Sequence, residues 1–235
     1  MSASLPSDQN GLRKRVHRLT SALEKHLGVP RVRRRGDLIG SFVLTTLSQH
    51  TSDLNADRAF KALEGRFARW EDVARASPGA IASAIRSAGL ANQKSIRIRD
   101  FVCWVKDTFG DYDLAPIRKM PTQEIIGLLT SVKGIGIKTV SVVLLFSLGR
   151  DVFPVDTHVH RICRRIGLVP ETATAEKTHH LMAPLVPPGK AMSLHVNMLR
   201  LGRTICFARG PKCGICPLNR LCDYAARHYL PPAAR

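Results

Sequence analysis

Four cysteines near the C-terminal end of the chain could bind a metal. Cys206, Cys213, Cys216 and Cys222 are separated by six, two and five residues. A thiolate needs only a short loop to reach a metal, so four sulfurs in one compact stretch predict a metal centre. The spacing leaves two metals open. One is a structural zinc ion, which usually takes two Cys-x-x-Cys pairs, and the other is an iron-sulfur cluster.

The other readings of the cysteines are weaker. The sequence starts without the apolar segment of a secretory signal, so we expect a reducing compartment and no disulfide framework. Cys103 and Cys163 lie in apolar helical patterns, which predicts buried small side chains rather than metal ligands.

A second candidate for chemistry is a glycine turn between two apolar segments. Residues 132–138 read VKGIGIK, between helices that we predict at about 123–131 and 139–148. Two glycines permit a tight turn and a close approach of the backbone to another molecule. Amide groups at the start of the second helix would then face an anion such as a nucleic acid phosphate.

Lys138 and Asp156 are the candidate catalytic residues. Lys138 falls in the first turn of the predicted second helix, where the helix dipole and the apolar surroundings favour the neutral, nucleophilic amine. A phosphate-binding lysine is the alternative interpretation. Asp156 precedes a helix predicted to start near Thr157, so we expect it to cap that helix. Its carboxylate could also stabilise positive charge or assist a proton transfer. His158 and His160 are two residues apart and point to different faces, which argues against a shared metal.

The charge balance indicates a polyanionic partner. The 235 residues include 36 Lys and Arg against 18 Asp and Glu, a formal net charge of +18. The excess is spread along the chain, with clusters at 13–18 and 31–35. No segment approaches the roughly 20 apolar residues of a membrane-spanning helix, and no lipidation signal is present. Nucleic acid is therefore the expected partner, and no membrane contact is expected.

Helical periodicity dominates the chain. Apolar residues recur at steps of three and four, as in Leu12, Val16, Leu19, Leu23 and Leu27, and prolines and glycines separate the stripes. The pattern predicts an all-α fold.

The glycine turn with Lys138, the Val-Asp-Thr-His stretch with Asp156 and the cysteine spacing together closely resemble the helix-hairpin-helix DNA glycosylases of the endonuclease III type. The resemblance extends from about residue 37 to 224 and keeps the three motifs in the family's order. It implies that the cysteines hold a [4Fe-4S] cluster rather than zinc. The resemblance also implies that the chain divides into three regions. An N-terminal basic helix at 1–35 would pack in the cluster domain, a six-helix barrel at 36–150 would contain the hairpin at about 123–148, and the cluster domain at 151–235 would contain the four-cysteine loop at 206–222.

The same resemblance implies an activity. The expected enzyme is a base excision repair DNA glycosylase with AP lyase (β-elimination) activity that removes damaged pyrimidines, with Lys138 as the Schiff-base nucleophile and Asp156 as its assistant. Its partner would be double-stranded DNA with damaged bases or abasic sites. We expect a monomer in the cytoplasm of a prokaryote, associated with the nucleoid. Two alternatives stay open: a mismatch-type uracil or thymine DNA glycosylase of the same fold, and a noncatalytic helix-hairpin-helix DNA-binding protein.

The resemblance also assigns DNA contacts. A wedge residue in the stretch 47–53 is either Gln49 or His50, and Leu90 in the stretch 88–94 is the apolar wedge. Contacts to the DNA are further expected at the hairpin and in the cysteine segment, from Lys133, Gly134, Ile135, Gly136, Thr139, Arg209 and Lys212. Lys133 stands where the family usually has proline, which adds a positive charge beside the turn.

Overall fold

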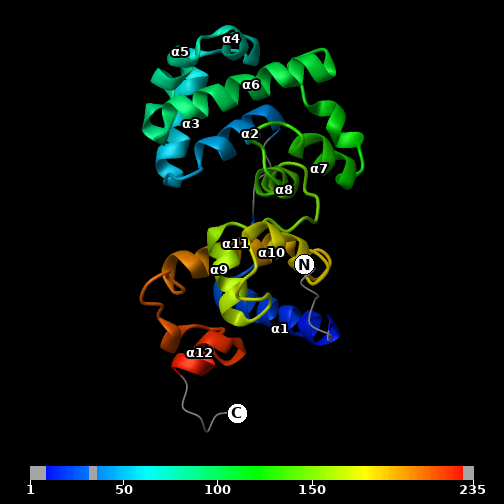
Figure 1. Cartoon of the computed structure of the whole chain (residues 1–235), viewed down its shortest axis with the longest axis vertical. Helices are drawn as coiled ribbons and strands as arrows, with labels where there is room; N and C mark the ends of the chain where they lie inside the picture. Colours follow the sequence, from blue (N-terminus) through cyan, green and yellow to red (C-terminus); the bar gives the residue numbers. More distant parts are fainter. Residues whose placement is uncertain (1–8, 32–35, 230–235) are drawn as a thin grey trace. The chain divides into compact units, whose positions relative to one another are not determined.

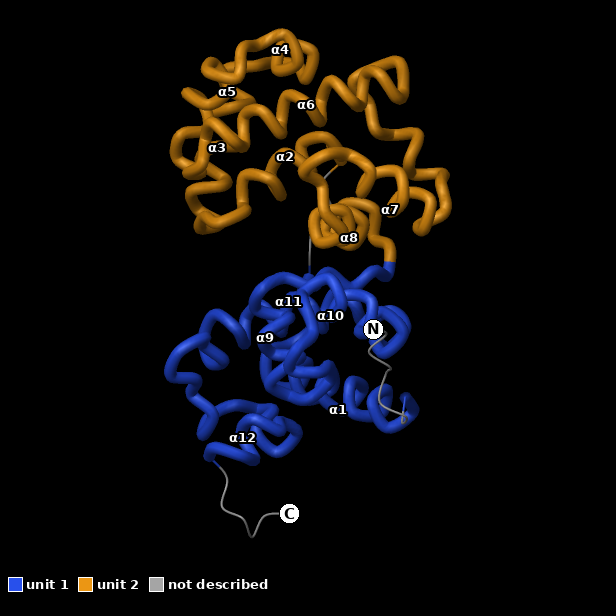
Figure 2. Tube along the Cα trace, viewed as in Figure 1, with its two compact units in different colours: residues 1–33, 151–235 blue, residues 34–150 orange. Residues whose placement is uncertain are grey.

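The computed structural model describes residues 9–31 and 36–229. Helices make up all the regular secondary structure of these residues, and no strand occurs among them, which confirms the all-α prediction. The chain divides into two compact units (Figure 2). Unit 1 contains residues 1–33 and 151–235, and unit 2 contains residues 34–150. Residues 32–35 of the basic cluster at 31–35 lie outside the described residues.

Unit 2 carries the glycine turn. Its helices are α2 (Leu38–Leu47), α3 (Asp53–Arg66), α4 (Trp70–Arg75), α5 (Pro78–Ala84), α6 (Ala91–Phe109), α7 (Thr122–Thr130) and α8 (Ile137–Phe146), with short 3-10 helices η1 (Arg86–Ala88) and η2 (Ala115–Lys119). The long helix α6 packs on α2, α4 and α5, and α8 packs on α2 and α7 (Figure 1). Within the unit, α6 therefore contacts three other α-helices and α8 contacts two.

The core of unit 2 explains why α8 is so apolar. Val140, Val143 and Leu144 are at most 1% exposed, because α2 and α7 cover the helix. In α2, Phe42 lies against Phe101 of α6, with ring centroids 5.0 Å apart. The buried hydroxyl of Ser147 donates to that of Ser41 over 2.9 Å. Burial of this apolar surface fixes the helix whose first turn carries Lys138.

Unit 1 is built from both ends of the chain. Its helices are α1 (Gln9–Leu27), α9 (Thr157–Ile166), α10 (Ala175–Met182), α11 (Ala191–Thr204) and α12 (Asp223–His228), with short 3-10 helices η3 (Cys213–Ile215) and η4 (Asn219–Leu221). Helix α9 packs on α10, α11 and α12, and α1 packs on α11. The apolar stripe predicted for α1 is buried, since Val16, Leu19 and Leu23 are 0% exposed.

Polar contacts attach α1 to the C-terminal part of unit 1. The carboxylate of Glu24 pairs with Lys190 over 3.0 Å and accepts a hydrogen bond from Ser193 over 2.5 Å. Arg15 donates to the carbonyl of Leu221 over 2.9 Å and pairs with Asp223. The first helix thus braces the segment that carries the cysteines. Across the part of the chain that the structure describes, none of the helices has the length and apolar character needed to cross a membrane.

Candidate active site and metal centre

The glycine turn joins α7 to α8 as the sequence predicts. The amide of Ile135 donates to the carbonyl of Val132 over 3.0 Å and closes the turn. Gly134 has a φ of +88° and a Cβ there would lie 3.4 Å from Cδ of Arg97, so this position favours glycine. Gly136 has an ordinary φ of −93°, and a Cβ there would meet nothing within 4 Å. Only the first glycine is needed for the backbone, and the space beside Gly136 is open to a ligand.

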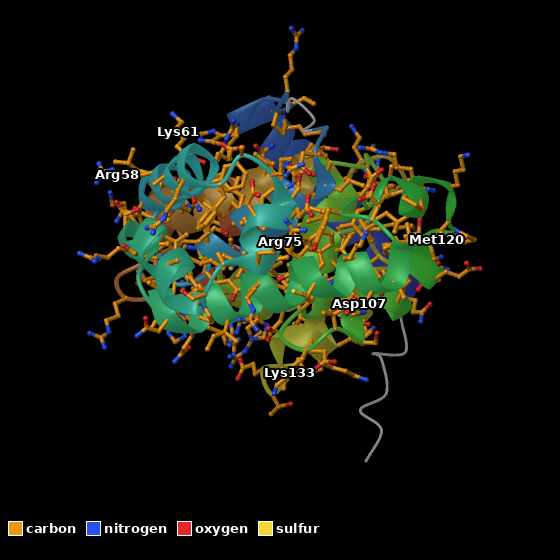
Figure 3. The ribbon with its side chains drawn as sticks, turned by 90° about the horizontal axis from the view of Figure 1, so that it is seen from above. Arg58, Lys61, Arg75, Asp107, Met120 and Lys133 are labelled. Carbon is orange, nitrogen blue, oxygen red and sulfur yellow. The ribbon has the colours of Figure 1, made fainter. Side chains whose placement is uncertain are left out.

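Lys138 is the second residue of α8, which confirms its predicted place in the first turn of a helix. Its side chain is half-buried. The next residue, Thr139, is 4% exposed, and its hydroxyl accepts a hydrogen bond from Nε2 of the Gln49 side chain over 3.5 Å. Lys133 projects outward from the turn (Figure 3). The hairpin therefore presents one half-buried and one exposed lysine within six residues.

The two predicted wedge loops share an unusual backbone feature. His50 has a φ of +55° and Leu90 a φ of +49°, and among the described residues they alone combine a side chain with a positive φ. Leu90 is 54% exposed, and His50 is exposed as well. The side chain of Gln49 instead accepts a hydrogen bond from Arg97 over 3.3 Å. Which of Gln49 and His50 enters the DNA stays a prediction.

Asp156 caps α9, as the sequence predicts. Its Oδ1 accepts a hydrogen bond from the amide of Val159 over 2.8 Å. Asp156 belongs to unit 1 and Lys138 to unit 2, so their joint action stays a prediction. The two histidines of this stretch have separate partners. Nδ1 of His158 lies 3.0 Å from Nη2 of Arg161, and Nδ1 of His160 lies 2.9 Å from the hydroxyl of Thr178.

The four cysteines of the C-terminal segment line one small cavity. Its other walls include the apolar side chains of Ile205, Pro211 and Ala225. No group of three or more His, Cys, Asp or Glu side chains in residues 9–31 and 36–229 is arranged to hold a single metal ion. A tetrahedral zinc ion with Zn–S bonds of about 2.3 Å would need its sulfurs about 3.8 Å apart. The four thiols thus share a cavity without forming the tight tetrahedron of one ion.

The cavity favours neutral thiols. Burial raises the pKa of Cys216 to about 11, and it also raises the pKa of Cys213 and of Cys222. Neighbouring cysteines add to each of these shifts because thiolates repel one another. A bound metal requires thiolates, so its binding must release protons and compensate this repulsion.

The remaining cysteines lie outside the cavity. Cys163 is 0% exposed, and burial raises the pKa of its thiol to about 12. Cys103 is half-buried in α6, with its sulfur 4.0 Å from the carbonyl of Ala74. The prediction of a buried side chain is confirmed for Cys163, while Cys103 is only partly covered.

Two arginines of α9 hold the start of the cysteine segment, and sequence reasoning missed their role. Arg165 donates to Sγ of Cys206 over 3.3 Å and to the carbonyl of Phe207 over 2.6 Å. Arg161 donates to the carbonyl of Cys206 over 2.8 Å. The available signal was their spacing of four residues, which places both on one face of a helix.

The basic residues predicted to grip phosphates are exposed. Arg209 and Lys212 both lie on the surface of the cysteine segment. The ammonium of Lys212 is 5.5 Å from the ring centroid of Phe207. This part of the segment carries positive charge toward solvent, as a phosphate contact requires.

Comparison with known proteins identifies the family. Residues 43–188 match the model of the HhH-GPD superfamily of base excision DNA repair proteins. The chain belongs to this superfamily. Within it the chain is similar to endonuclease III, and the predicted resemblance to that type is confirmed.

Two relatives and one solved structure show the extent of the similarity. Endonuclease III of Thermotoga maritima is 30% identical over 201 residues, which cover 84% of this chain and 88% of that protein. The "Putative DNA glycosylase" of Arabidopsis thaliana is 34% identical over 182 residues; the match covers 77% of this chain but only 59% of that protein. A trapped covalent intermediate of endonuclease III with DNA has a TM-score of 0.77 at 22% identity and covers 92% of this chain and 97% of that one. The last comparison establishes the fold.

Proposed function

We propose that this protein is a DNA glycosylase and AP lyase of base excision repair, acting on double-stranded DNA that contains a damaged pyrimidine or an abasic site. The observation that carries the proposal is the position of Lys138, in the first turn of α8 directly after the glycine turn. Amide groups at a helix start attract phosphate, and the exposed Lys133 adds positive charge to the same turn. The half-buried Lys138 directly follows this turn, which supports a role in attacking the sugar next to the bound phosphate.

The chemistry follows from a neutral lysine amine. The damaged base is first extruded from the duplex. Nζ of Lys138 attacks C1′ of the deoxyribose, the bond between C1′ and the base breaks, and the base leaves with the electron pair and takes a proton. Opening of the bond between C1′ and the ring oxygen then gives a Schiff base. Loss of a C2′ proton expels the 3′ phosphate, which cuts the strand.

Asp156 has a supporting role in this scheme. Its carboxylate either accepts the proton that the lysine loses or stabilises the positive charge that develops at C1′. The cap hydrogen bond from the amide of Val159 fixes the carboxylate at the start of α9.

We also propose that Cys206, Cys213, Cys216 and Cys222 hold a [4Fe-4S] cluster. The donor set fits, because four thiols line one largely apolar cavity and Arg165 donates to the sulfur of Cys206. When bound, the cluster supplies iron–thiolate bonds that fix the segment. The exposed Arg209 and Lys212 are then held rigidly enough to contact phosphates beside the lesion.

Borohydride trapping on duplex DNA with an abasic site tests the activity. We expect the wild-type protein to form a covalent adduct and Lys138→Gln to form none while still binding the duplex. Lys133→Gln is the matched control from the same turn. It should keep the adduct but bind more weakly and with a smaller salt dependence, because it loses one phosphate contact.

Three outcomes would contradict parts of the proposal. If the wild-type protein binds the duplex without forming an adduct, the lyase prediction fails, as expected for a noncatalytic DNA-binding protein. Loss of binding in Lys138→Gln would make this lysine a phosphate contact. On a panel of duplexes with thymine glycol, dihydrouracil, and uracil or thymine opposite guanine, excision from the mismatches alone would identify a mismatch glycosylase.

A further inference from the structure

Lys94 is a buried cation at the start of α6. Its side chain is 2% exposed, although it lies in the first turns of a helix on a highly charged protein. Its ammonium donates to the carbonyls of Leu47 and Gln49, over 2.7 Å each, and to the carbonyl of Ala88 over 2.9 Å. An ammonium has three N–H donors, so all of them are used. The charge is satisfied entirely by backbone oxygens of unit 2.

The three carbonyls that accept from Lys94 belong to two chain segments, residues 47–49 and residue 88. Leu47 is the last residue of α2 and Ala88 the last residue of η1. Carbonyls at the C-terminal end of a helix lack partners within the helix and carry partial negative charge. Two such ends and the carbonyl of Gln49 therefore converge on one positive charge.

The location is otherwise unfavourable for a lysine. The start of α6 is the positive end of its dipole, and burial, with a smaller contribution from Arg97, lowers the pKa of Lys94. The three short hydrogen bonds offset this cost by stabilising the charged form. They also occupy every N–H of the amine, so Lys94 is not a second nucleophile beside Lys138.

The segments tied by Lys94 are the two wedge loops. We name residues 48–52 the His50 loop and residues 88–90 the Leu90 loop. The carbonyl of Gln49 directly precedes His50, and the carbonyl of Ala88 lies two residues before Leu90. Both tip residues have the left-handed backbone that side chains disfavour. Such conformations persist only where the surroundings fix them.

We propose that Lys94 is a positioning residue that holds the His50 loop and the Leu90 loop at one fixed separation, so that both enter the duplex at the same lesion. The inference rests on the proposed function, since it concerns DNA with an extruded nucleotide. Arg97, three residues further along α6, strengthens the arrangement by donating to the side chain of Gln49 over 3.3 Å. Both loops and Lys138 belong to unit 2, so their spacing is set within one compact unit.

The test separates loop placement from chemistry and from stability. The variant is Lys94→Met, and the control is Val105→Ala, which removes packing from a residue of the same helix that is 0% exposed. The first readout is the fluorescence of 2-aminopurine opposite a tetrahydrofuran abasic analogue in a duplex, which rises when wedge residues unstack the base and requires no reaction. The others are single-turnover excision from duplex DNA and borohydride trapping on a single-stranded abasic oligonucleotide.

We expect Lys94→Met to bind the duplex but to lose most of the fluorescence rise. Excision from the duplex should fall about 100-fold, the cost of misplacing reacting groups by about 1 Å. Trapping on the single strand should stay at the wild-type level, because no wedge is needed there. Val105→Ala should keep all three signals.

Two results would overturn the inference. One is a full fluorescence rise and full excision rate in Lys94→Met. The other is a parallel loss of duplex and single-strand signals in both variants, which would reflect stability alone. If the wild-type protein forms no adduct but gives a fluorescence rise that Lys94→Met loses, the proposed lyase fails and the positioning role stands.

A second variant decides the matter if Lys94→Met does not fold. Lys94→Arg keeps the positive charge, but a planar guanidinium cannot direct three donors at carbonyls arranged around one point. It should fold and show a reduced fluorescence rise. A wild-type rise in Lys94→Arg would then overturn the inference.

Discussion

In both units, cationic side chains donate hydrogen bonds to backbone carbonyls and so fix a loop. The two units differ in how much of the loop these hydrogen bonds hold. In unit 2, Lys94 is buried and its three donors are matched by three carbonyls. In unit 1, Arg161 and Arg165 hold only the start of the cysteine segment. The thiols beyond them line a cavity that favours their neutral form. Protein groups alone hold the loops of unit 2, whereas the proposed cluster would add iron–thiolate bonds to the contacts that hold the cysteine segment of unit 1.

The largest expected effect tests that dependence in unit 1. Cys216→Ser should lose iron and sulfide and destabilise unit 1 by several kcal/mol, since structural metal binding contributes about 10 kcal/mol or more in small metal-folded domains. Iron and sulfide analysis and hydrogen exchange of each unit measure this. The matched control is Cys103→Ala, outside the cavity, which should keep full iron content. Stoichiometric zinc in a colourless wild-type protein would contradict the cluster.

The next effect separates the two roles of one residue. Asn caps a helix about as well as Asp, so Asp156→Asn should leave the stability of unit 1 nearly unchanged. It should slow base excision by about 10²- to 10⁴-fold, the usual contribution of a general acid or base. Asp156→Ala should lose both the activity and about 1 kcal/mol of stability. Single-turnover kinetics and thermal unfolding measure the two effects. Full activity in Asp156→Asn would reduce this residue to a helix cap.

The smallest effect concerns the attachment of α1. Burial raises the pKa of Glu24, but hydrogen bonds from Ser193 and Lys190 outweigh it and lower the pKa below its ordinary value of 4.5. Because the pKa of Glu24 is lower in the folded state, its ionised carboxylate stabilises the fold fully above pH 4.5. This stabilisation is lost as the pH falls through the pKa of the folded state. Glu24→Gln should therefore cost about 1 to 2 kcal/mol at pH 7 and progressively less in acid. Denaturant titrations from pH 7 into acid measure the difference in the free energy of unfolding between the wild-type protein and Glu24→Gln. A difference that does not change with pH would contradict the stabilising role of the ionised Glu24.

The sequence predicts the helices and the hairpin well, because both depend on local patterns. The apolar run at 139–148 is helical at Ile137–Phe146, and the glycine turn lies where the two glycines indicate. Asp156 is the cap that its place before Thr157 predicts. Each of these signals is contained within a few neighbouring residues.

The supporting contacts could not be predicted in the same way. In sequence, Lys94 is an ordinary lysine near the start of a helix, and its burial depends on the ends of α2 and η1, which arrive from 47 and 6 residues away. Arg165 likewise acts on residues 41 and 42 positions further along the chain. In a sequence, a charged side chain on the surface cannot be told from one that makes hydrogen bonds to distant segments, because no local pattern distinguishes the two.

The division of the chain between the units also sets an order of assembly. Unit 2 is contained in residues 34–150, whereas unit 1 needs residues from both ends. Helix α1 can pack only after α11 has been synthesised, since α11 is its packing partner. Asn197 of α11 also donates to the carbonyl of Gly28, just after α1, over 2.9 Å. At ribosomal rates of about 5–20 residues per second, the delay between the synthesis of α1 and that of α11 is roughly 10 to 30 seconds. The hairpin unit, residues 34–150, can fold while α1 is still without its partner, because α11 and the four cysteines are synthesised after it. The proposed cluster can therefore be loaded only after the whole of unit 2 has been synthesised.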